Sequence, residues 1–183
     1  MKRIQWTGNP DLEDVDDRAK GDDGPVTEGE AAFLEGLAKA LRPNLIAEVG
    51  TGWGRSLKAF TEAQEWLYEL GITCEVYTCD TSLECVDDAK DGYYAACVVH
   101  GNAESLSHAL SGRKIDLLFI DGLHTGEQAL ADLNTLKPHL SKNAVVLFHD
   151  LNIPDAYADL KEAISAIGVM VLPTAKGIGI LRR

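Results

Sequence analysis

The segment 44–57, NLIAEVGTGWGRSL, constrains the fold more than any other part of the chain. An apolar run ends at Glu48, a cluster of glycines (Gly50, Gly52 and Gly54) follows, and Ser56 then opens a helical pattern. This order predicts a strand, a tight glycine loop and a helix start, which is how α/β proteins hold a nucleotide-like ligand at the carboxyl edge of a sheet. Glycine allows positive φ and close approach of a ligand to the backbone. The first N–H groups of the helix would face any negative group on that ligand.

The rest of the chain alternates between strand and helix patterns. A capping box formed by Thr27 and Glu30 predicts a first helix that ends before Pro43. Strands are expected near 45–49, 74–79, 97–100, 115–120 and 144–148, with helices near 56–70, 83–90, 103–110, 126–136 and 155–167. Two last strands, near 169–172 and 177–181, are too close for a crossover helix and predict an antiparallel hairpin. The pattern therefore predicts a Rossmann-like, doubly wound α/β fold with a mostly parallel, seven-stranded sheet.

The length of 183 residues suits a single domain. We expect that domain to occupy residues 25–183, preceded by an acidic arm at residues 1–24. The arm is expected to be a mobile, solvated tail. The alternative is a flap over the substrate, with Trp6 as its apolar anchor.

Charge and composition narrow the classes of partner and compartment. The net charge is −12 and the basic residues are scattered, which argues against nucleic acid as a partner. No apolar stretch approaches the ~20 residues of a membrane span, and the first residues have no apolar core of a signal peptide. The four cysteines lack C-x-x-C spacing, so we expect reduced thiols with buried apolar packing as their default role, and a cytoplasmic protein.

Polar residues follow nearly every predicted strand, at the edge where ligands bind in such sheets. These positions are Glu48, Asp80, Gly101–Asn102–Ala103, Asp121 and His149–Asp150. Like charges gathered at one edge raise one another's pKa, which favours a functional role. Asp80 suits a ribose diol, or caps the next helix, or does both. Asn102 either binds an adenine edge or is an ordinary turn residue.

The last two strand ends carry the groups suited to acid–base or metal chemistry. His124 lies three residues after Asp121 and titrates near neutral pH, so it can take a proton from a hydroxyl. If the strands ending at Asp121 and Asp150 are neighbours, the two carboxylates can share a metal with His149; imidazole with carboxylates favours Mn, Fe or Zn over Mg or Ca. The alternatives are a loop histidine at 124, a loop cap at Asp150 and a His149 side chain packed on the sheet.

The glycine spacing does not match the dinucleotide pattern G-x-G-x-x-G, because Arg55 stands where the third glycine would be. E-x-G-x-G-x-G instead resembles motif I of class I S-adenosylmethionine-dependent methyltransferases. From Val26 to Arg183 the chain resembles small bacterial O-methyltransferases of the catechol and caffeoyl-CoA type and a related short group with an I-D-G-x-H element. The segments that carry the resemblance are VTEGEAAFL, EVGTGWGRS, CDTSLE, HGNAESL, FIDGLH and VLFHD.

The resemblance implies methyl transfer from S-adenosylmethionine to a small-molecule hydroxyl, possible metal assistance by Mg, Mn or another divalent ion, and a homodimer. It implies catalytic roles for His124 and Asp121 and metal ligation by Asp121, His149 and Asp150. The implied cofactor-binding residues are Glu48, Gly50, Thr51, Gly52, Gly54, Ser56, Asp80, Asn102, Ala103 and Asp121. His149–Asp150 departs from the Asp-Asn of metal-dependent members, and His124 stands where many members have a catalytic lysine.

Two rival functions stay open on the sequence. One is another enzyme on the same cofactor fold, such as an aminopropyl transferase or a nicotinamide oxidoreductase. The other is a non-catalytic S-adenosylmethionine-binding or interaction protein.

Overall fold

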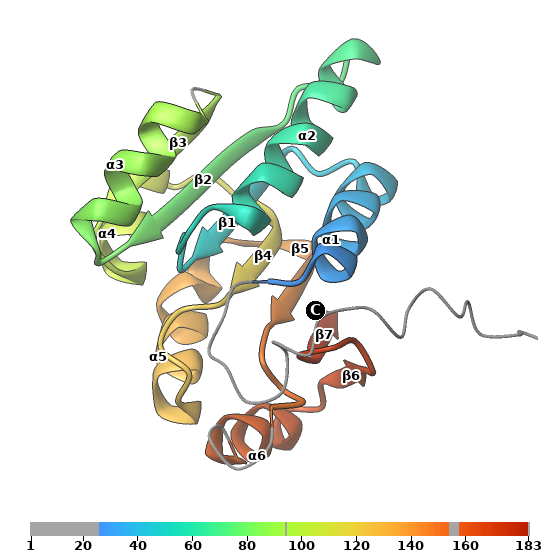
Figure 1. The fold of residues 1–183 in the computed structure, drawn as a ribbon, viewed down its shortest axis with the longest axis vertical. Helices are drawn as coiled ribbons and strands as arrows, with labels where there is room; N and C mark the ends of the chain where they lie inside the picture. The colour runs from blue at the N-terminus through green and yellow to red at the C-terminus, as the bar shows by residue number, and fades with distance from the viewer. Residues whose placement is uncertain (1–25, 94, 154–157, 183) are drawn as a thin grey trace, which may run out of the picture.

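The computed structural model describes residues 26–93, 95–153 and 158–182. The expected arm at 1–24, including the suggested flap with Trp6, lies outside the described residues. Within them the chain forms one α/β sandwich (Figure 1).

A seven-stranded sheet with the order β3-β2-β1-β4-β5-β7-β6 forms the middle layer. Its strands are β1 (Leu45–Val49), β2 (Glu75–Asp80), β3 (Ala96–His100), β4 (Ile115–Ile120), β5 (Leu140–Phe148), β6 (Met170–Leu172) and β7 (Ile178–Arg182). The first five strands pair in parallel, whereas β7 runs antiparallel to both β5 and β6. The expected mostly parallel sheet with a reversed hairpin strand is therefore confirmed.

Helices cover both faces of this sheet, as Figure 1 shows. They are α1 (Glu28–Leu41), α2 (Arg55–Glu69), α3 (Leu83–Gly92), α4 (Ala103–Leu110), α5 (Gly126–Leu136) and α6 (Ala158–Ala166). Helices α1, α2 and α3 contribute to one hydrophobic core, and α4, α5 and α6 contribute to the other. No helix among the described residues is both long enough and apolar enough to cross a bilayer.

The alternation of side chains along each strand decides which residues face which helical layer. In β1, Leu45, Ala47 and Val49 pack toward α4–α6, and Ile46 packs toward α1–α3. The same period of two places Glu48 on the α1–α3 side. Polar residues at the carboxyl edge are thus assigned to one layer by their position in the strand.

Helix starts differ in a way that matters for ligand binding. The side chain of Thr27 caps α1 and forms the expected box with Glu30, and Asn102 caps α4. Helix α2 instead begins after Gly54, at φ 76°, with no side-chain cap and no acidic residue in its first turn. Its first N–H groups are therefore available to an anion.

The longest strand begins earlier than the sequence predicts. Strand β5 starts at Leu140 rather than near 144, directly after a 3₁₀ turn at Lys137–His139. Leu140 pairs with Ile115, and the register then shifts before Leu117. The sequence does not predict these first residues of β5, because residues 141–143 are polar and no apolar pattern marks them as a strand.

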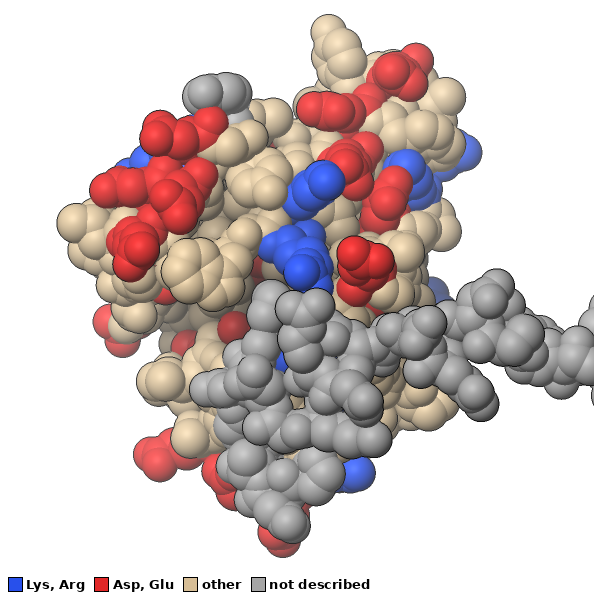
Figure 2. All heavy atoms as spheres, in the orientation of Figure 1, with Lys and Arg blue, Asp and Glu red and all other residues tan. Residues whose placement is uncertain are grey.

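Charges are unevenly spread over the surface. Figure 2 shows acidic side chains gathered over α3, where Glu84, Asp87, Asp88 and Asp91 are exposed. This face lies at the β2–β3 side of the sheet and repels polyanions, an effect that salt screens.

From β1 the chain continues through β2 and β3 toward one side of the sheet, and it then returns to β4 on the other side of β1. The direction of winding therefore reverses between β1 and β4, and the loops after these two strands contact each other. Asp121 N donates to Val49 O (2.8 Å), while Gly50 N and Thr51 N both donate to Cys79 O (2.9 and 3.2 Å). Gly50 has φ 92°, and a Cβ at this position would collide with the carbonyl of Asp121. Glycine at position 50 therefore lets the glycine loop contact the loop after β4 directly.

We predict that Gly50→Ala lowers the free energy of unfolding by about 3 kcal/mol or more, because strain at positive φ adds to the collision with Asp121. Gly52→Ala is the matched control, since Gly52 (φ 48°) has open space around a Cβ and its strain costs about 1–2 kcal/mol. Urea denaturation measures both. Equal losses for the two variants would show that the Gly50–Asp121 contact does not determine the need for glycine.

Candidate functional site

A cavity of about 170 Å³ opens at the carboxyl edge between the loops after β1 and β4. It lies where the winding reverses, the usual ligand position in open α/β sheets. Its lining residues are Val26, Gly50, Thr51, Gly52, Trp53, Arg55, Ser56, Asp121, His124 and Asp150. The structure therefore brings most of the expected glycine loop together with Asp121, His124 and Asp150, whereas His149 does not line this cavity.

Glu48 lies beneath the glycine loop and is fully buried. Thr78 Oγ1 donates to Glu48 Oε2 (2.6 Å), and Thr78 in turn is 2.6 Å from Thr51 Oγ1. The second oxygen, Oε1, has no hydrogen-bond partner among the described residues. Burial raises the pKa of Glu48 to about 8, against the opposing hydrogen bonds from Ser56 and Thr78.

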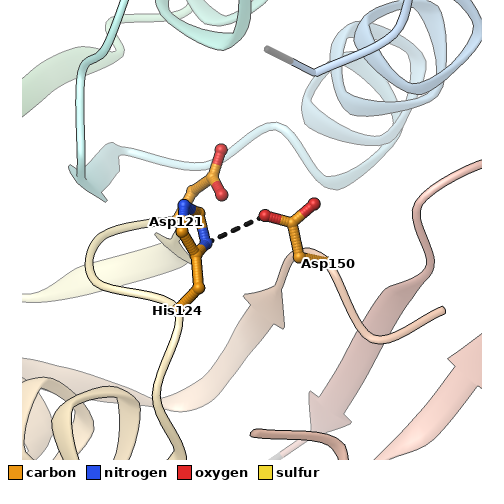
Figure 3. Close-up of side chains that lie close together, drawn as sticks. All are labelled: Asp121, His124 and Asp150. Carbon is orange, nitrogen blue, oxygen red and sulfur yellow. Dashed lines mark ion pairs between the residues drawn. The ribbon is translucent and has the colours of Figure 1, made fainter. Parts of the chain in front are cut away.

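His124 and Asp150 form an ion pair beside the cavity, with 2.9 Å between Nδ1 and Oδ2 (Figure 3). The hydrogen bond that His124 donates to Asp150 raises the pKa of His124, although partial burial opposes this. Asp150 itself adopts the left-handed conformation at φ 63°, which is uncommon outside glycine. Such strain concentrates at functional sites.

His149 lies beneath this pair, with its side chain only 1% exposed. Its Nδ1 is 3.0 Å from Asp121 Oδ1 and 3.2 Å from Asp150 Oδ1, and its Nε2 is 3.3 Å from Glu30 Oε2. The ring also contacts Phe119 edge-on, at 5.8 Å between centroids. Both nitrogens therefore face carboxylates, as suits an imidazolium that donates twice.

The pKa values of this group follow from mutual pairing. Burial alone would lower the pKa of His149, but Asp121, Asp150 and Glu30 raise it well above its usual value. Burial alone would raise the pKa of Glu30, but the bond and charge of His149 lower it to about 2. Asp150 is likewise held below its usual range by His124 and His149, against the effect of burial. Burial dominates at Asp121, whose pKa is raised despite His149.

The carboxylates and imidazoles that lie closest together differ in one residue from the expected metal ligands. One ligand atom from each of Asp121, His124 and Asp150 lies within 4.8 Å of the other two (Figure 3). His149 continues the alternation of Val145 and Leu147, so its side chain turns under the sheet edge toward α1 and its nitrogens are taken by carboxylates. The geometric group of possible ligands thus contains His124 and not His149, and metal ligation by Asp121, His149 and Asp150 stays a prediction.

Two of the residues expected to contact the nucleoside, Asp80 and Asn102, have backbone partners within the protein. Asp80 accepts from Gly52 N (2.9 Å) and Ser82 N (2.8 Å), and Ser82 rather than Asp80 caps α3. Asn102 accepts from two N–H groups of α4, and Ala103 is buried in the core. Their ribose and adenine contacts stay predictions.

Sequence reasoning missed three contributors to the site. Glu30 was identified as a helix cap alone, yet it contacts His149 across 119 positions of sequence. Sequence reasoning does not single out Thr78, although Thr78 lies two residues before Asp80 in β2 and therefore on the same face of the strand. Trp53, 68% exposed between two glycines, lines the cavity.

Comparison with known proteins identifies the domain. Residues 47–151 match the family model described as a methyltransferase domain. An alignment of 134 positions with an uncharacterised protein of Sinorhizobium fredii shows 30% identity. That match includes 64% of this chain and 14% of the relative, so the chain spans a small part of the relative's length.

Solved structures share the fold at low identity. A methyltransferase from Geobacter sulfurreducens superposes with a TM-score of 0.68 at 22% identity, covering 86% of this chain and 79% of the other. An O-methyltransferase from Bacillus cereus, solved with S-adenosylhomocysteine, gives 0.66 at 16% identity, covering 86% and 82%. These likenesses show the fold.

The buried carboxyl group of Glu48 gives a prediction of pH dependence. Its pKa rises on folding from 4.5 to about 8, so the folded state holds a proton that the unfolded state releases. Its stabilising contribution is complete below about pH 4.5 and is lost as the pH rises through about 8. Relative to Glu48→Gln, the wild type should lose up to about 1.4 kcal/mol per pH unit between pH 5 and 8.

Urea denaturation of both proteins across this range measures the difference, with the exposed Glu69→Gln as the control. Parallel pH profiles of wild type and Glu48→Gln would contradict the assignment of the proton to Glu48.

Proposed function

The chain belongs to the methyltransferase domain family, and on that premise we propose that it transfers a methyl group from S-adenosylmethionine to a hydroxyl oxygen of a small molecule. The observation that carries the proposal is the His124–Asp150 pair, which lines the same cavity as the glycine loop. A proton acceptor and a cofactor loop at one cavity are what a hydroxyl methylation requires.

Several features of the chain fit the aminoacyl end of that cofactor. The uncapped N–H groups of α2 suit its carboxylate. The buried Oε1 of Glu48 has no hydrogen-bond partner among the described residues, and an ammonium group that displaces the proton held by Glu48 would satisfy it. Arg55, which lines the cavity, adds a positive charge near the carboxylate position.

The cavity volume limits how much of the cofactor is enclosed. At about 170 Å³ it is smaller than the ~300–1,000 Å³ of typical ligand sites, so it suits the aminoacyl end and the methyl group. We place the nucleoside outside it, along the open edge toward Asp80, whose carboxylate already binds Gly52 N.

The residues of this chain would act mainly by positioning and by proton transfer. The bound sulfonium supplies an activated methyl group. His124, oriented by Asp150, takes the proton of the acceptor hydroxyl as the oxygen forms its bond to the methyl carbon and the sulfur–methyl bond breaks. Trp53 gives the acceptor an apolar wall, and alignment with exclusion of water supplies much of the rate gain.

A divalent ion is a second candidate, because Asp121, His124 and Asp150 together offer two carboxylates and an imidazole, a donor set that suits Mn or Fe. When bound, the ion would supply Lewis-acid stabilisation of the acceptor oxygen. His124 cannot ligate an ion and accept a proton through the same lone pair. We take the base role as primary, since Asp150 already orients His124.

All four cysteines are free thiols, which suits a reducing compartment, and we place the protein in the cytoplasm. A homodimer stays a prediction from the family resemblance.

We predict micromolar binding of S-adenosylhomocysteine by calorimetry, and release of this product from S-adenosylmethionine with an acceptor from a panel of catechols, phenols and sugars. His124→Gln should lower kcat by about 10²–10⁴-fold with unchanged product affinity, because it removes the base and leaves the loop intact. The exposed His108→Gln is the control. Binding without turnover across the panel would favour the non-catalytic alternative, and no binding would refute the proposal.

Chelation separates the two roles of His124. Turnover of protein treated with EDTA should persist and should not rise when Mn²⁺ is added, because a base needs no ion. A loss of turnover on chelation that Mn²⁺ restores would contradict the base role and establish the metal role.

A further inference from the structure

Glu30 makes more contacts than a helix cap requires. Its side chain is buried, and its Oε2 accepts from Thr27 N (3.1 Å) and Thr27 Oγ1 (2.8 Å), as in an ordinary capping box. The same oxygen faces His149 Nε2 at 3.3 Å, and Oε1 accepts from Lys176 N at 2.9 Å. Both carboxylate oxygens thus reach beyond α1 to the end of β5 and to the turn between β6 and β7.

The first route from Glu30 to the cavity passes through the ring of His149. Because imidazole is rigid, holding Nε2 on Glu30 fixes the direction of Nδ1, which points to Asp121 Oδ1 at 3.0 Å. The edge contact with Phe119 restricts the ring further. This chain of contacts links Glu30 through His149 to the carboxylate of Asp121 at the cavity wall.

The second route passes through the backbone. Lys176, whose N–H Glu30 accepts, offers its carbonyl to Asn152 N at 2.7 Å, and Gly177 O accepts from Leu151 N at 3.1 Å. These bonds hold the two residues that directly follow Asp150, whose backbone lies at φ 63°. A strained conformation persists only where its surroundings hold it in place.

We propose that Glu30 is a positioning residue that sets the geometry of Asp121 and Asp150, and through Asp150 that of His124. The inference rests on the proposed function. Glu30 touches neither cofactor nor acceptor in this scheme. Its loss should therefore reduce turnover far more than it reduces cofactor binding, since supporting residues typically change activity by about 10–100-fold.

Thr27 provides the matched control, because it belongs to the capping box of Glu30 but is not on the routes that connect Glu30 to the cavity through His149 and Lys176. Thr27→Ala removes the hydroxyl from the capping box and leaves Glu30 able to contact His149 and Lys176. Glu30→Gln keeps the shape of the side chain and can no longer accept hydrogen bonds at both ends. Chemical denaturation of both full-length variants measures how much each weakens the fold.

Steady-state kinetics with the acceptor found above is the first readout. We expect kcat of Glu30→Gln to fall about 10–100-fold, with KM for S-adenosylmethionine changed less than about twofold and with kcat of Thr27→Ala near that of the wild type. Equal losses of kcat in the two variants, in proportion to their losses of stability, would overturn the proposal. So would an unchanged kcat in Glu30→Gln.

Imidazole NMR of the full chain is the second readout and needs no acceptor. The Nδ1–H resonance of His149 should keep its position in Thr27→Ala and shift or vanish in Glu30→Gln. An unchanged resonance in Glu30→Gln would overturn the proposal on its own. If the wild type shows no turnover, the proposed function fails, and this spectrum still decides whether Glu30 orients His149 toward Asp121.

Discussion

The site depends on one buried cluster, in which the imidazole of His149 lies between the carboxylates of Glu30, Asp121 and Asp150. We call it the His149 cluster. Asp121 and Asp150 face one nitrogen of the ring and Glu30 faces the other, all within 3.3 Å. Unpaired charges are costly inside a protein, so each member of the group makes burial of the others tolerable. Because these residues lie just after β4, just after β5 and in α1, the His149 cluster joins three parts of the chain at the edge where the cavity opens.

The glycine loop and the His149 cluster lie on different sides of the cavity and have different proposed roles. Close contact between Gly50 and Asp121 sets the proposed cofactor side of the cavity directly against the proposed acid–base side. The uncapped start of α2 and the unpartnered oxygen of Glu48 lie on the first side, whereas the His124–Asp150 pair lies on the second. The fold therefore supplies one side suited to holding a zwitterionic tail and another suited to moving a proton.

Local patterns in the sequence predicted most of the fold, and long-range pairing explains what they could not predict. Strand β1 and helices α4 and α5 have the predicted bounds, because apolar periodicity acts within a few residues. The predicted capping box of α1 at Thr27 is also a local signal. The carboxyl-edge position of Asp121 and Asp150 followed from strand order. The direction of His149 depended on its partner Glu30, 119 positions away, and no local pattern encodes that pair. The capping of α4 by Asn102 likewise depends on helix geometry, and its expected contact with adenine stays a prediction.

The most direct test of this account is a crystal structure of the full chain grown with S-adenosylhomocysteine. The account predicts the homocysteine carboxylate at the N–H groups of Arg55–Leu57, the amino group against Glu48 and the sulfur facing the side of the cavity that holds His124. Density for the ligand elsewhere, or a cavity filled by side chains of the protein at saturating ligand, would contradict it.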